Sequence, residues 1–213
     1  MNDESKTKGA TAGEDESGLL IPHLTTREMR NSFELEVIGR AYDKHVFRGR
    51  KKKSGTRWLT EDYLRQVHMD MFGSIWDWAG TFRQSDVNIG IPWHQIPEQV
   101  RMMCDDFIFW DSPQSSMSVI EIAARLQNRL TRIHPFKNGN GRHARLITDT
   151  FFRSRDHALS AWPQIQLMPQ GDAVRARYIS AMKKADQEDF SELMSFISEF
   201  LPKKKEGESG PGS

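Results

Sequence analysis

The most chemically capable part of the sequence is IHPFKNGNGRHARL, residues 133–146. His134 stands immediately before Pro135, and the residue before a proline is disfavoured in helical conformation. The histidine therefore lies at a break in the chain, where its side chain can project into a cleft. An imidazole whose pKa lies near neutrality can take a proton from a hydroxyl group. The position and the residue type together predict a general base.

The residues that follow could hold a phosphate group beside this base. Glycines and asparagines at 138–141 permit the backbone angles of a nest, in which several N–H groups point at one place. Helical spacing resumes at Asn140, and the opening of a helix attracts anions through its unpaired N–H groups and its dipole. Arg142 and Arg145 are three residues apart, so they share a face of this helix. Guanidinium groups beside a nest suit a polyphosphate, and the whole set indicates attack of a hydroxyl on phosphorus.

Amphipathic helices must position this loop. Capping residues followed by apolar residues at helical spacing predict helices over residues 24–42, 59–72, 96–110, 118–133, 140–152, 174–182 and 190–201. The first opens with Thr25 and Glu28 at capping-box spacing. The loop that carries the histidine joins the fourth helix to the fifth.

Residues 78–96 interrupt the helical pattern with glycines and prolines. Within them apolar residues alternate with small or polar ones, as in a β-strand, over Val87, Asn88, Ile89, Gly90 and Ile91. A strand too short to form its own sheet, beside several tryptophans, predicts a flap that covers a site. A loop pinned by its aromatic residues fits the pattern equally.

Composition narrows the class of protein. The chain has 213 residues, with 30 Lys and Arg against 29 Asp and Glu. This balance argues against a dedicated nucleic-acid-binding protein, and the basic run at 48–57 reads more simply as a solvated loop. No run is long and apolar enough to cross a membrane, and the first residues lack the apolar core of a secretion signal. The single cysteine, Cys104, lies on an apolar stripe and fits a reducing compartment, so we expect a cytoplasmic protein.

The chain is predicted to form one domain flanked by two tails. Residues 1–18 and 202–213 are mostly small, polar and charged types. Such segments cannot bury enough apolar surface to offset the entropy lost on ordering. Residues 19–201 carry the helical pattern without an internal repeat or a linker, so they form the domain.

The segment HPFKNGNGRHAR resembles the signature of the Fic family, His-x-Phe-x-(Asp/Glu)-Gly-Asn-Gly-Arg-x-x-Arg. It matches at every specified position but one, namely at His134, Phe136, Gly139, Asn140, Gly141, Arg142 and Arg145. The stretches TTREMRNSFELEVIGRA and WDWAGTFRQSDVNIGIPWHQIP resemble the bacterial subgroup called mobile mystery protein B. The resemblance extends over roughly residues 18–160.

The resemblance implies an all-α fold, in which the motif joins two central helices beneath a small β-hairpin flap. It also implies an activity, because most Fic proteins transfer AMP from ATP to a Ser, Thr or Tyr hydroxyl of a target protein. By that resemblance His134 is the base that deprotonates the hydroxyl, and Arg142 and Arg145 grip the phosphates. The implied anion hole consists of Gly139, Asn140 and Gly141. The target's backbone would add as a strand to the flap at Val87–Ile91.

One position departs from the family pattern. Where the family has an Asp or Glu that coordinates Mg²⁺ together with the nucleotide phosphates, this chain has Asn138. An amide oxygen can ligate Mg²⁺ but brings no charge, and Asp149 lies too far along the helix to substitute. We expect weak metal binding and slow transfer, or alternatively a nucleotide- or partner-binding module that has lost the chemistry. Phosphoryl transfer, as in relatives with Lys at the third cradle position, is disfavoured by Gly141.

Family members also carry a self-inhibitory helix, (Ser/Thr)-x-x-x-Glu-(Gly/Asn), whose glutamate pairs with the second motif arginine. Two partial matches are present, ending at Glu36 and at Glu199, and both lack the final Gly or Asn. If neither acts, Arg145 is restrained by a separate antitoxin chain or is not restrained. An antitoxin partner would make the protein a toxin that acts on a housekeeping target.

Overall fold

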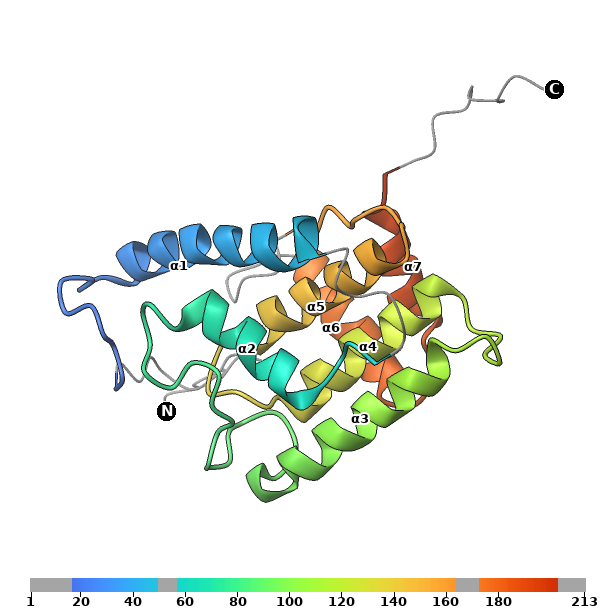
Figure 1. Ribbon diagram of the computed structural model, residues 1–213, viewed down its shortest axis with the longest axis horizontal. Helices are drawn as coiled ribbons and strands as arrows, with labels where there is room; N and C mark the ends of the chain where they lie inside the picture. The colour runs from blue at the N-terminus through green and yellow to red at the C-terminus, as the bar shows by residue number, and fades with distance from the viewer. Residues whose placement is uncertain (1–16, 50–56, 164–172, 203–213) are drawn as a thin grey trace, which may run out of the picture.

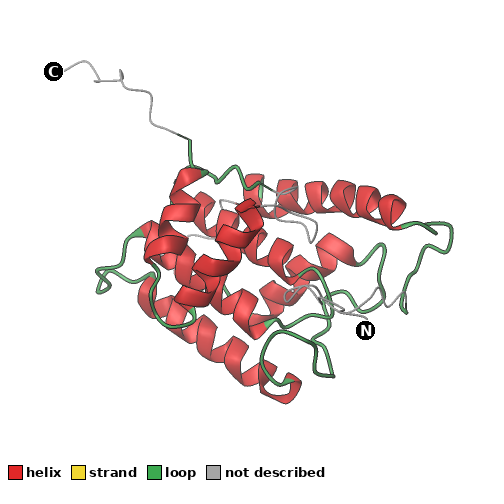
Figure 2. Cartoon of the chain, turned by 180° about the vertical axis from the view of Figure 1, so that it is seen from behind, coloured by secondary structure: helices red, strands yellow, loops and turns green. Residues whose placement is uncertain are grey.

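The computed structural model describes residues 17–49, 57–163 and 173–202. These ranges form seven α-helices and no β-strand, so the expected all-α fold is confirmed (Figures 1 and 2). The α-helices are α1 (Arg27–Tyr42), α2 (Glu61–Phe72), α3 (Ile96–Trp110), α4 (Val119–Ile133), α5 (Asn140–Ser154), α6 (Ala173–Ala185) and α7 (Ser191–Glu199). A π-helical turn, η1 (Asp43–Phe47), continues α1, and a 3₁₀ turn, η3 (Trp93–Gln95), precedes α3.

Local capping signals fix where these helices begin. Thr60 caps α2 and Ser118 caps α4, each by accepting a hydrogen bond of 3.1 Å from the backbone N–H three residues on. Pro97 occupies the first turn of α3, where its missing N–H has no consequence. The cap of α1 is Thr26 rather than Thr25, so the predicted start of this helix was one residue early.

Helices α4 and α5 form the centre of the protein. Every residue of α5 from His143 to Phe152 is buried, so this helix is surrounded on nearly all sides. One side of the central pair is covered by α2 and η1, which pack against α5, and α1 lies against α2. On the other side α3, α6 and α7 pack against α4 (Figure 1). Burial of the apolar faces between these layers stabilises the central pair and fixes the loop 134–139 that joins them.

The predicted β-hairpin flap is not formed in the described ranges. Residues Val87–Ile91 are bends and irregular backbone, and the nearby pairing is an isolated antiparallel bridge between Phe82 and Phe136. The alternating pattern alone makes no strand because strand formation needs a neighbouring strand to complete its hydrogen bonds. The carbonyl groups at both ends of this turn, of Ser85 and Ile91, accept hydrogen bonds from an arginine side chain instead.

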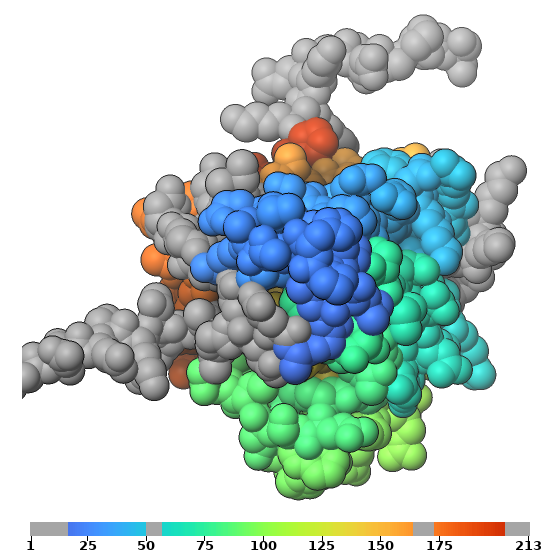
Figure 3. Space-filling view, turned by 90° about the vertical axis from the view of Figure 1, so that its left-hand side faces the viewer, coloured from blue at the N-terminus to red at the C-terminus, as the bar shows by residue number. Residues whose placement is uncertain are grey.

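The predicted tails lie largely outside the described residues, as do 50–56 of the basic run at 48–57. The last two residues of the predicted N-terminal tail contact the folded body. The carbonyl of Gly18 accepts a 2.9 Å hydrogen bond from the backbone of Asp77, and Lys137 donates to the Ser17 hydroxyl at 2.7 Å. In Figure 3 the blue N-terminal residues meet the green residues that follow α2. No described helix is long and apolar enough to span a membrane.

Candidate active site

His134 occupies the break between the two central helices. Helix α4 ends at Ile133, and His134 adopts the left-handed conformation with φ of 52°, donating its backbone N–H to Leu130 at 3.1 Å. Its side chain is 6% exposed, and neither ring nitrogen has a hydrogen-bond partner among the described residues. Buried polar atoms without partners are uncommon, and they concentrate at functional sites.

Burial also sets the protonation state of this imidazole. Desolvation lowers the pKa of His134 to about 4; the nearby Thr131 backbone acts in the opposite direction without meeting hydrogen-bond geometry, and the positive charge of Arg83 acts in the same direction as desolvation. The ring is therefore neutral near pH 7, with a free lone pair on one nitrogen. A neutral, unpaired imidazole is the form that can accept a proton.

The loop after His134 is closed by its own side chains. Asn140 accepts a hydrogen bond from the Phe136 N–H at 2.9 Å and donates to the Phe136 carbonyl at 2.8 Å. Phe136 is fully buried and anchors the loop in the core. Gly139 has φ of 77°, and a Cβ there would lie 2.5 Å from the ring of Phe72, so only glycine fits this position.

His68 supports the loop from α2, a role that sequence reasoning did not assign. Its Nδ1 accepts the backbone N–H of Gly80 at 3.0 Å, and its Nε2 donates to the carbonyl of Asn138 at 3.0 Å. The ring stacks on Phe136 with 3.7 Å between centroids. Burial holds the pKa of His68 well below its usual value, and this neutral tautomer ties the loop to the segment after α2.

The opening of α5 provides donors for an anion. The first N–H groups of a helix have no carbonyl partner within it, so those of Asn140, Gly141 and Arg142 face the mouth of α5. The helix dipole adds positive potential at the same place. These three residues belong to the predicted nest, and the structure places them in the first turn of α5, after the left-handed Gly139.

A carboxylate from α1 contacts the first motif arginine. Arg142 donates to Glu34 at 2.5 Å, and its guanidinium lies 4.9 Å from the centroid of the Phe72 ring. Glu34 is 5% exposed and also accepts the indole N–H of Trp76 at 2.8 Å. A buried carboxylate held between an arginine and an indole is a fixed structural feature rather than a chance surface pair. Sequence reasoning missed Glu34.

The two glutamates predicted as self-inhibitory residues have other partners. Glu36 pairs with Arg40 one turn further along α1, at 2.6 Å. Glu199 pairs with Arg177 across α6 and α7, also at 2.6 Å. Both pairs are largely exposed to solvent. The carboxylate that meets the motif is Glu34, and it meets the first arginine of the motif.

The second motif arginine is buried beside a carboxylate network. Arg145 is 5% exposed. One helical turn further, Asp149 accepts hydrogen bonds from the Tyr42 hydroxyl at 2.9 Å and from the Trp162 indole at 3.0 Å. Burial raises the pKa of Asp149 to about 7, although these donors and Arg145 favour its charged form. Asp149 is therefore engaged inside the protein and does not take the place of a carboxylate at position 138.

Asn138 offers an uncharged and already engaged oxygen. Its side-chain oxygen accepts the backbone N–H of Gly139 at 2.7 Å. Across 17–49, 57–163 and 173–202, no group of three His, Cys, Asp or Glu side chains could hold a metal ion. Since Mg²⁺ prefers carboxylate and phosphate oxygens, the residues present do not by themselves fit a magnesium site.

The turn that carries Val87–Ile91 lies directly on His134. Gly90 has φ of 102°, and a Cβ added there would lie 2.6 Å from the His134 Cβ. A side chain of Asp86 closes the turn by accepting the backbone N–H of Trp93 at 2.8 Å. The segment predicted as a flap is thus placed over the predicted base, although it is not a β-strand.

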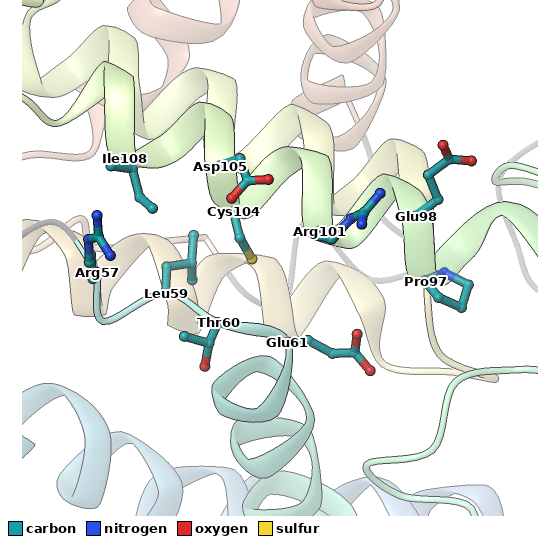
Figure 4. A pocket seen from close by; sticks show the side chains of 10 residues that line it. All are labelled: Arg57, Leu59, Thr60, Glu61, Pro97, Glu98, Arg101, Cys104, Asp105 and Ile108. Atoms are coloured by element: carbon teal, nitrogen blue, oxygen red, sulfur yellow. The ribbon is translucent and has the colours of Figure 1, made fainter.

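Two cavities formed by described residues are lined entirely by residues outside the motif. The larger, of about 750 Å³, runs between α3 and the residues that lead into α2, where Cys104 points toward Leu59 (Figure 4). Cys104 lies in the apolar core, as its apolar stripe predicts, and burial raises the pKa of its thiol to about 12. The smaller cavity, of about 260 Å³, is lined by Phe82, Arg83 and Trp93 among others. In this conformation the motif is covered by α1 and by the turn above His134.

Buried histidines make the stability of the fold dependent on pH. His143 is 1% exposed, burial lowers its pKa to about 4, and its Nε2 donates to the Leu64 carbonyl at 3.0 Å. Because the unfolded chain takes up this proton near pH 6.5, stability is complete above pH 6.5 and falls as the pH drops toward 4. The loss should reach roughly 3 kcal/mol for this residue. Urea unfolding of wild type and His143→Gln at pH 7 and pH 4.5 tests this, and equal pH dependence in both proteins would contradict it.

Comparison with known proteins agrees with the geometry. The model of the Fic/DOC family matches residues 58–152. The chain is 27% identical over 192 residues to protein adenylyltransferase fic-1 of Caenorhabditis briggsae, which covers 89% of this chain and 35% of that protein. It thus spans about a third of the length of that curated relative.

Solved structures share the fold. Fic-1 (residues 134–508) of Caenorhabditis elegans superposes with a TM-score of 0.65 at 21% identity, covering 85% of this chain and 51% of that one. The BepC protein of Bartonella tribocorum, solved with bound AMPPNP, superposes with a TM-score of 0.55 at 16% identity, covering 82% and 89%. The helical pair, the motif between its helices and these matches agree: residues 58–152 form a domain of the Fic/DOC family, and the fold of the chain is that of solved Fic structures.

Proposed function

We propose that this chain transfers AMP from ATP to a Ser, Thr or Tyr hydroxyl of a target protein. The observation that carries the proposal is His134, a buried and neutral imidazole whose ring nitrogens make no hydrogen bond among the described residues, in the loop that leads to an N-terminus of α5 not capped by a side chain. The relative from C. briggsae is named a protein adenylyltransferase, and the BepC structure contains an ATP analogue. Both support nucleotide use by the same fold.

The proposed reaction assigns a task to each part of the motif. The hydroxyl oxygen of the target forms a bond to the α-phosphorus of ATP while the bond to the β-phosphate oxygen breaks, and pyrophosphate leaves. The hydroxyl proton passes to His134. The backbone N–H groups of Asn140, Gly141 and Arg142 stabilise the charge that develops on the phosphate oxygens. The guanidinium groups of Arg142 and Arg145 hold the remaining phosphates.

The target would dock on the turn above His134. Residues Val87–Ile91 lie against the histidine through Gly90, so a backbone strand added along them would bring its side chains to the base. This arrangement accounts for how a short irregular segment can serve as a flap. It becomes strand-like only when the target supplies the missing neighbour.

The described residues do not by themselves fit Mg²⁺, so the phosphates of ATP would have to supply most of its ligands. The amide oxygen of Asn138 is the group of the motif that could contribute to holding the ion. When bound, Mg²⁺ neutralises phosphate charge. The residues of the chain still perform the binding, orientation and proton transfer described above.

Replacing Asn138 with Asp is expected to lower the Mg²⁺ concentration needed for half-maximal transfer by roughly tenfold, because a carboxylate adds charge at a position beside the phosphates. Asp can keep the hydrogen bond from the Gly139 N–H, so the loop should hold its shape. A magnesium titration of the labelling rate measures this. Superimposable titration curves for the two proteins would contradict a metal role for position 138.

Glu34 is the proposed restraint on activity. It binds Arg142, which is one of the groups that would hold the phosphates. A triphosphate can gain this guanidinium only if Glu34 releases it, so α1 would keep the enzyme at low activity. Restraint by a separate antitoxin chain is the alternative, and it predicts that changing Glu34 has no effect.

Two radioactive labels test the proposed reaction in a bacterial lysate. ATP labelled in the α-phosphate should label a target protein, whereas ATP labelled in the γ-phosphate should not, because pyrophosphate leaves. Label from the γ-phosphate would indicate phosphoryl transfer. ATP binding without labelling from either position would instead favour the nucleotide-binding module that the loss of charge at position 138 suggests.

A further inference from the structure

Arg83 stands out among the buried charged residues outside the motif. It is 5% exposed, and the nearest carboxylate oxygen, on Asp86, lies 3.7 Å from its Nη1. Asp86 is itself largely exposed to solvent. A buried guanidinium must be compensated by hydrogen bonds, and in Arg83 that compensation comes mainly from backbone carbonyl groups.

These carbonyl groups belong to two separate parts of the candidate site. On the motif side, Arg83 Nε donates to the carbonyl of His134 at 2.8 Å, and the Arg83 backbone N–H donates to the carbonyl of Pro135 at 2.9 Å. On the flap side, Nη1 donates to the carbonyl of Ser85 at 2.8 Å, and Nη2 donates to that of Ile91. One planar group therefore joins the histidine to both ends of the turn above it.

The histidine needs such support because its backbone is in a sparsely populated conformation. A non-glycine residue with positive φ, here 52°, is strained by about 1 kcal/mol or more. The bond from Arg83 Nε fixes the direction of the His134 carbonyl. The backbone of Gly90 packs directly against His134 and Arg83. A Cβ at this position would come within 3.0 Å of both the His134 Cβ and the Arg83 Nη2, so the close packing requires glycine.

We propose that Arg83 is a positioning residue for the transfer reaction, which holds the imidazole of His134 and the target-docking turn in a fixed relation to each other. The proposal rests on the proposed function and goes beyond the motif. In this role Arg83 acts through His134 and the turn, to which its hydrogen bonds run. Arginine suits the task because its donors are fixed in one plane, whereas the ammonium of lysine cannot reach three carbonyl groups that lie in different directions.

The test uses Arg83→Lys, which keeps the positive charge but removes the planar guanidinium group with its several N–H donors. With α-labelled ATP and bacterial lysate, the initial labelling rate at saturating ATP should fall at least roughly tenfold, because misplacement of a catalytic group by a fraction of an ångström slows transfer strongly. The affinity for ATP, measured by direct titration, should stay within about twofold of wild type, since the phosphate-holding groups are unchanged. A residue needed only for folding would lower the rate and the number of ATP sites per chain by the same factor, whereas the positioning role predicts a full complement of ATP sites with a lower rate.

Arg155→Lys is the matched control. Arg155 also joins two segments, by donating to a carboxylate oxygen of Asp111 at 2.7 Å and to the Asp111 carbonyl at 3.1 Å. It follows the C-terminal end of α5, about 20 Å from the helix mouth. This exchange should leave the labelling rate unchanged.

A second readout separates this proposal from the proposed function. NMR follows the ring signals of the histidines as the pH is changed. The signal of His134 is identified as the one that is missing from the spectrum of His134→Asn. In Arg83→Gln its ring should become more exposed and titrate nearer the ordinary pKa of histidine, whereas Arg155→Lys should leave it unchanged. A labelling rate or a His134 titration unaffected by the Arg83 substitutions would overturn the positioning role. Wild type that binds ATP and labels nothing would overturn the transfer reaction, and the titration would still decide the role of Arg83.

Discussion

Replacing Glu34 with glutamine is expected to raise the rate of AMP transfer by roughly 10- to 100-fold. The substitution removes a charge-assisted hydrogen bond to Arg142, which is worth about 1.5–3 kcal/mol, and every 1.4 kcal/mol corresponds to about a factor of ten. Glutamine can still accept the indole N–H of Trp76 through its amide oxygen, so the packing of α1 is preserved. Labelling of lysate proteins with α-labelled ATP gives the rate.

Glu36→Gln provides the matched control for this experiment. It makes the same substitution on the same helix, but at an exposed residue that pairs with Arg40. We expect wild-type activity and wild-type affinity for ATP in this variant. Equal rates in Glu34→Gln and Glu36→Gln would show that α1 does not restrain the enzyme, and would direct attention to an antitoxin chain.

Replacing His134 with alanine or asparagine is expected to reduce transfer by roughly 10²- to 10⁴-fold, the range typical of losing a general base. Affinity for ATP should stay within a few-fold, because the backbone N–H groups and both arginines remain. Asparagine is the more informative variant since it tolerates the left-handed conformation that His134 adopts. Rate measurements at saturating ATP, together with direct ATP titration, separate the two effects.

The stability of these variants distinguishes a catalytic residue from a structural one. His134 keeps two buried nitrogens without partners, so removing its ring should cost little stability. His23→Ala serves as a control at an exposed histidine outside the site. Transfer by His134→Asn at the wild-type rate would exclude the residue as the base.

Much of the site could be predicted from sequence because its signals are local. The proline after His134 ends α4, and Ser118 begins the same helix through its own side chain. Gly139 permits the positive φ that starts α5. Such features depend on residues a few positions apart, so one sequence contains all the information they require. The position of the histidine between two central helices follows from them.

Glu34 was missed because its role depends on a residue 108 positions away in sequence. The buried face of α1 contains Arg30 and Glu34 beside Val37, whereas the apolar Met29 is exposed. A signal was present, since Glu34 lies on the same helical face as Val37 and Ala41. Charged residues are seldom buried without a partner, and the partner is not visible in a local pattern.

For a similar reason, the sequence predicted that a distinct segment lies above His134 but not its backbone conformation. Alternation at Val87–Ile91 identified a flap-like element, but a strand also requires a neighbour, and the described chain supplies none. Arg83 and His68 had no motif to mark them. Their importance comes from carbonyl groups that tertiary structure brings within reach, those of His134 and Asn138.

Mass spectrometry of the most strongly labelled lysate protein is the decisive test of AMP transfer by His134. After reaction with the Glu34→Gln enzyme and ATP, we expect one AMP group on a Ser, Thr or Tyr hydroxyl of that lysate protein, and no AMP group when the enzyme carries His134→Asn as well. A phosphoryl group in place of AMP, or AMP that appears equally without the imidazole, would contradict it.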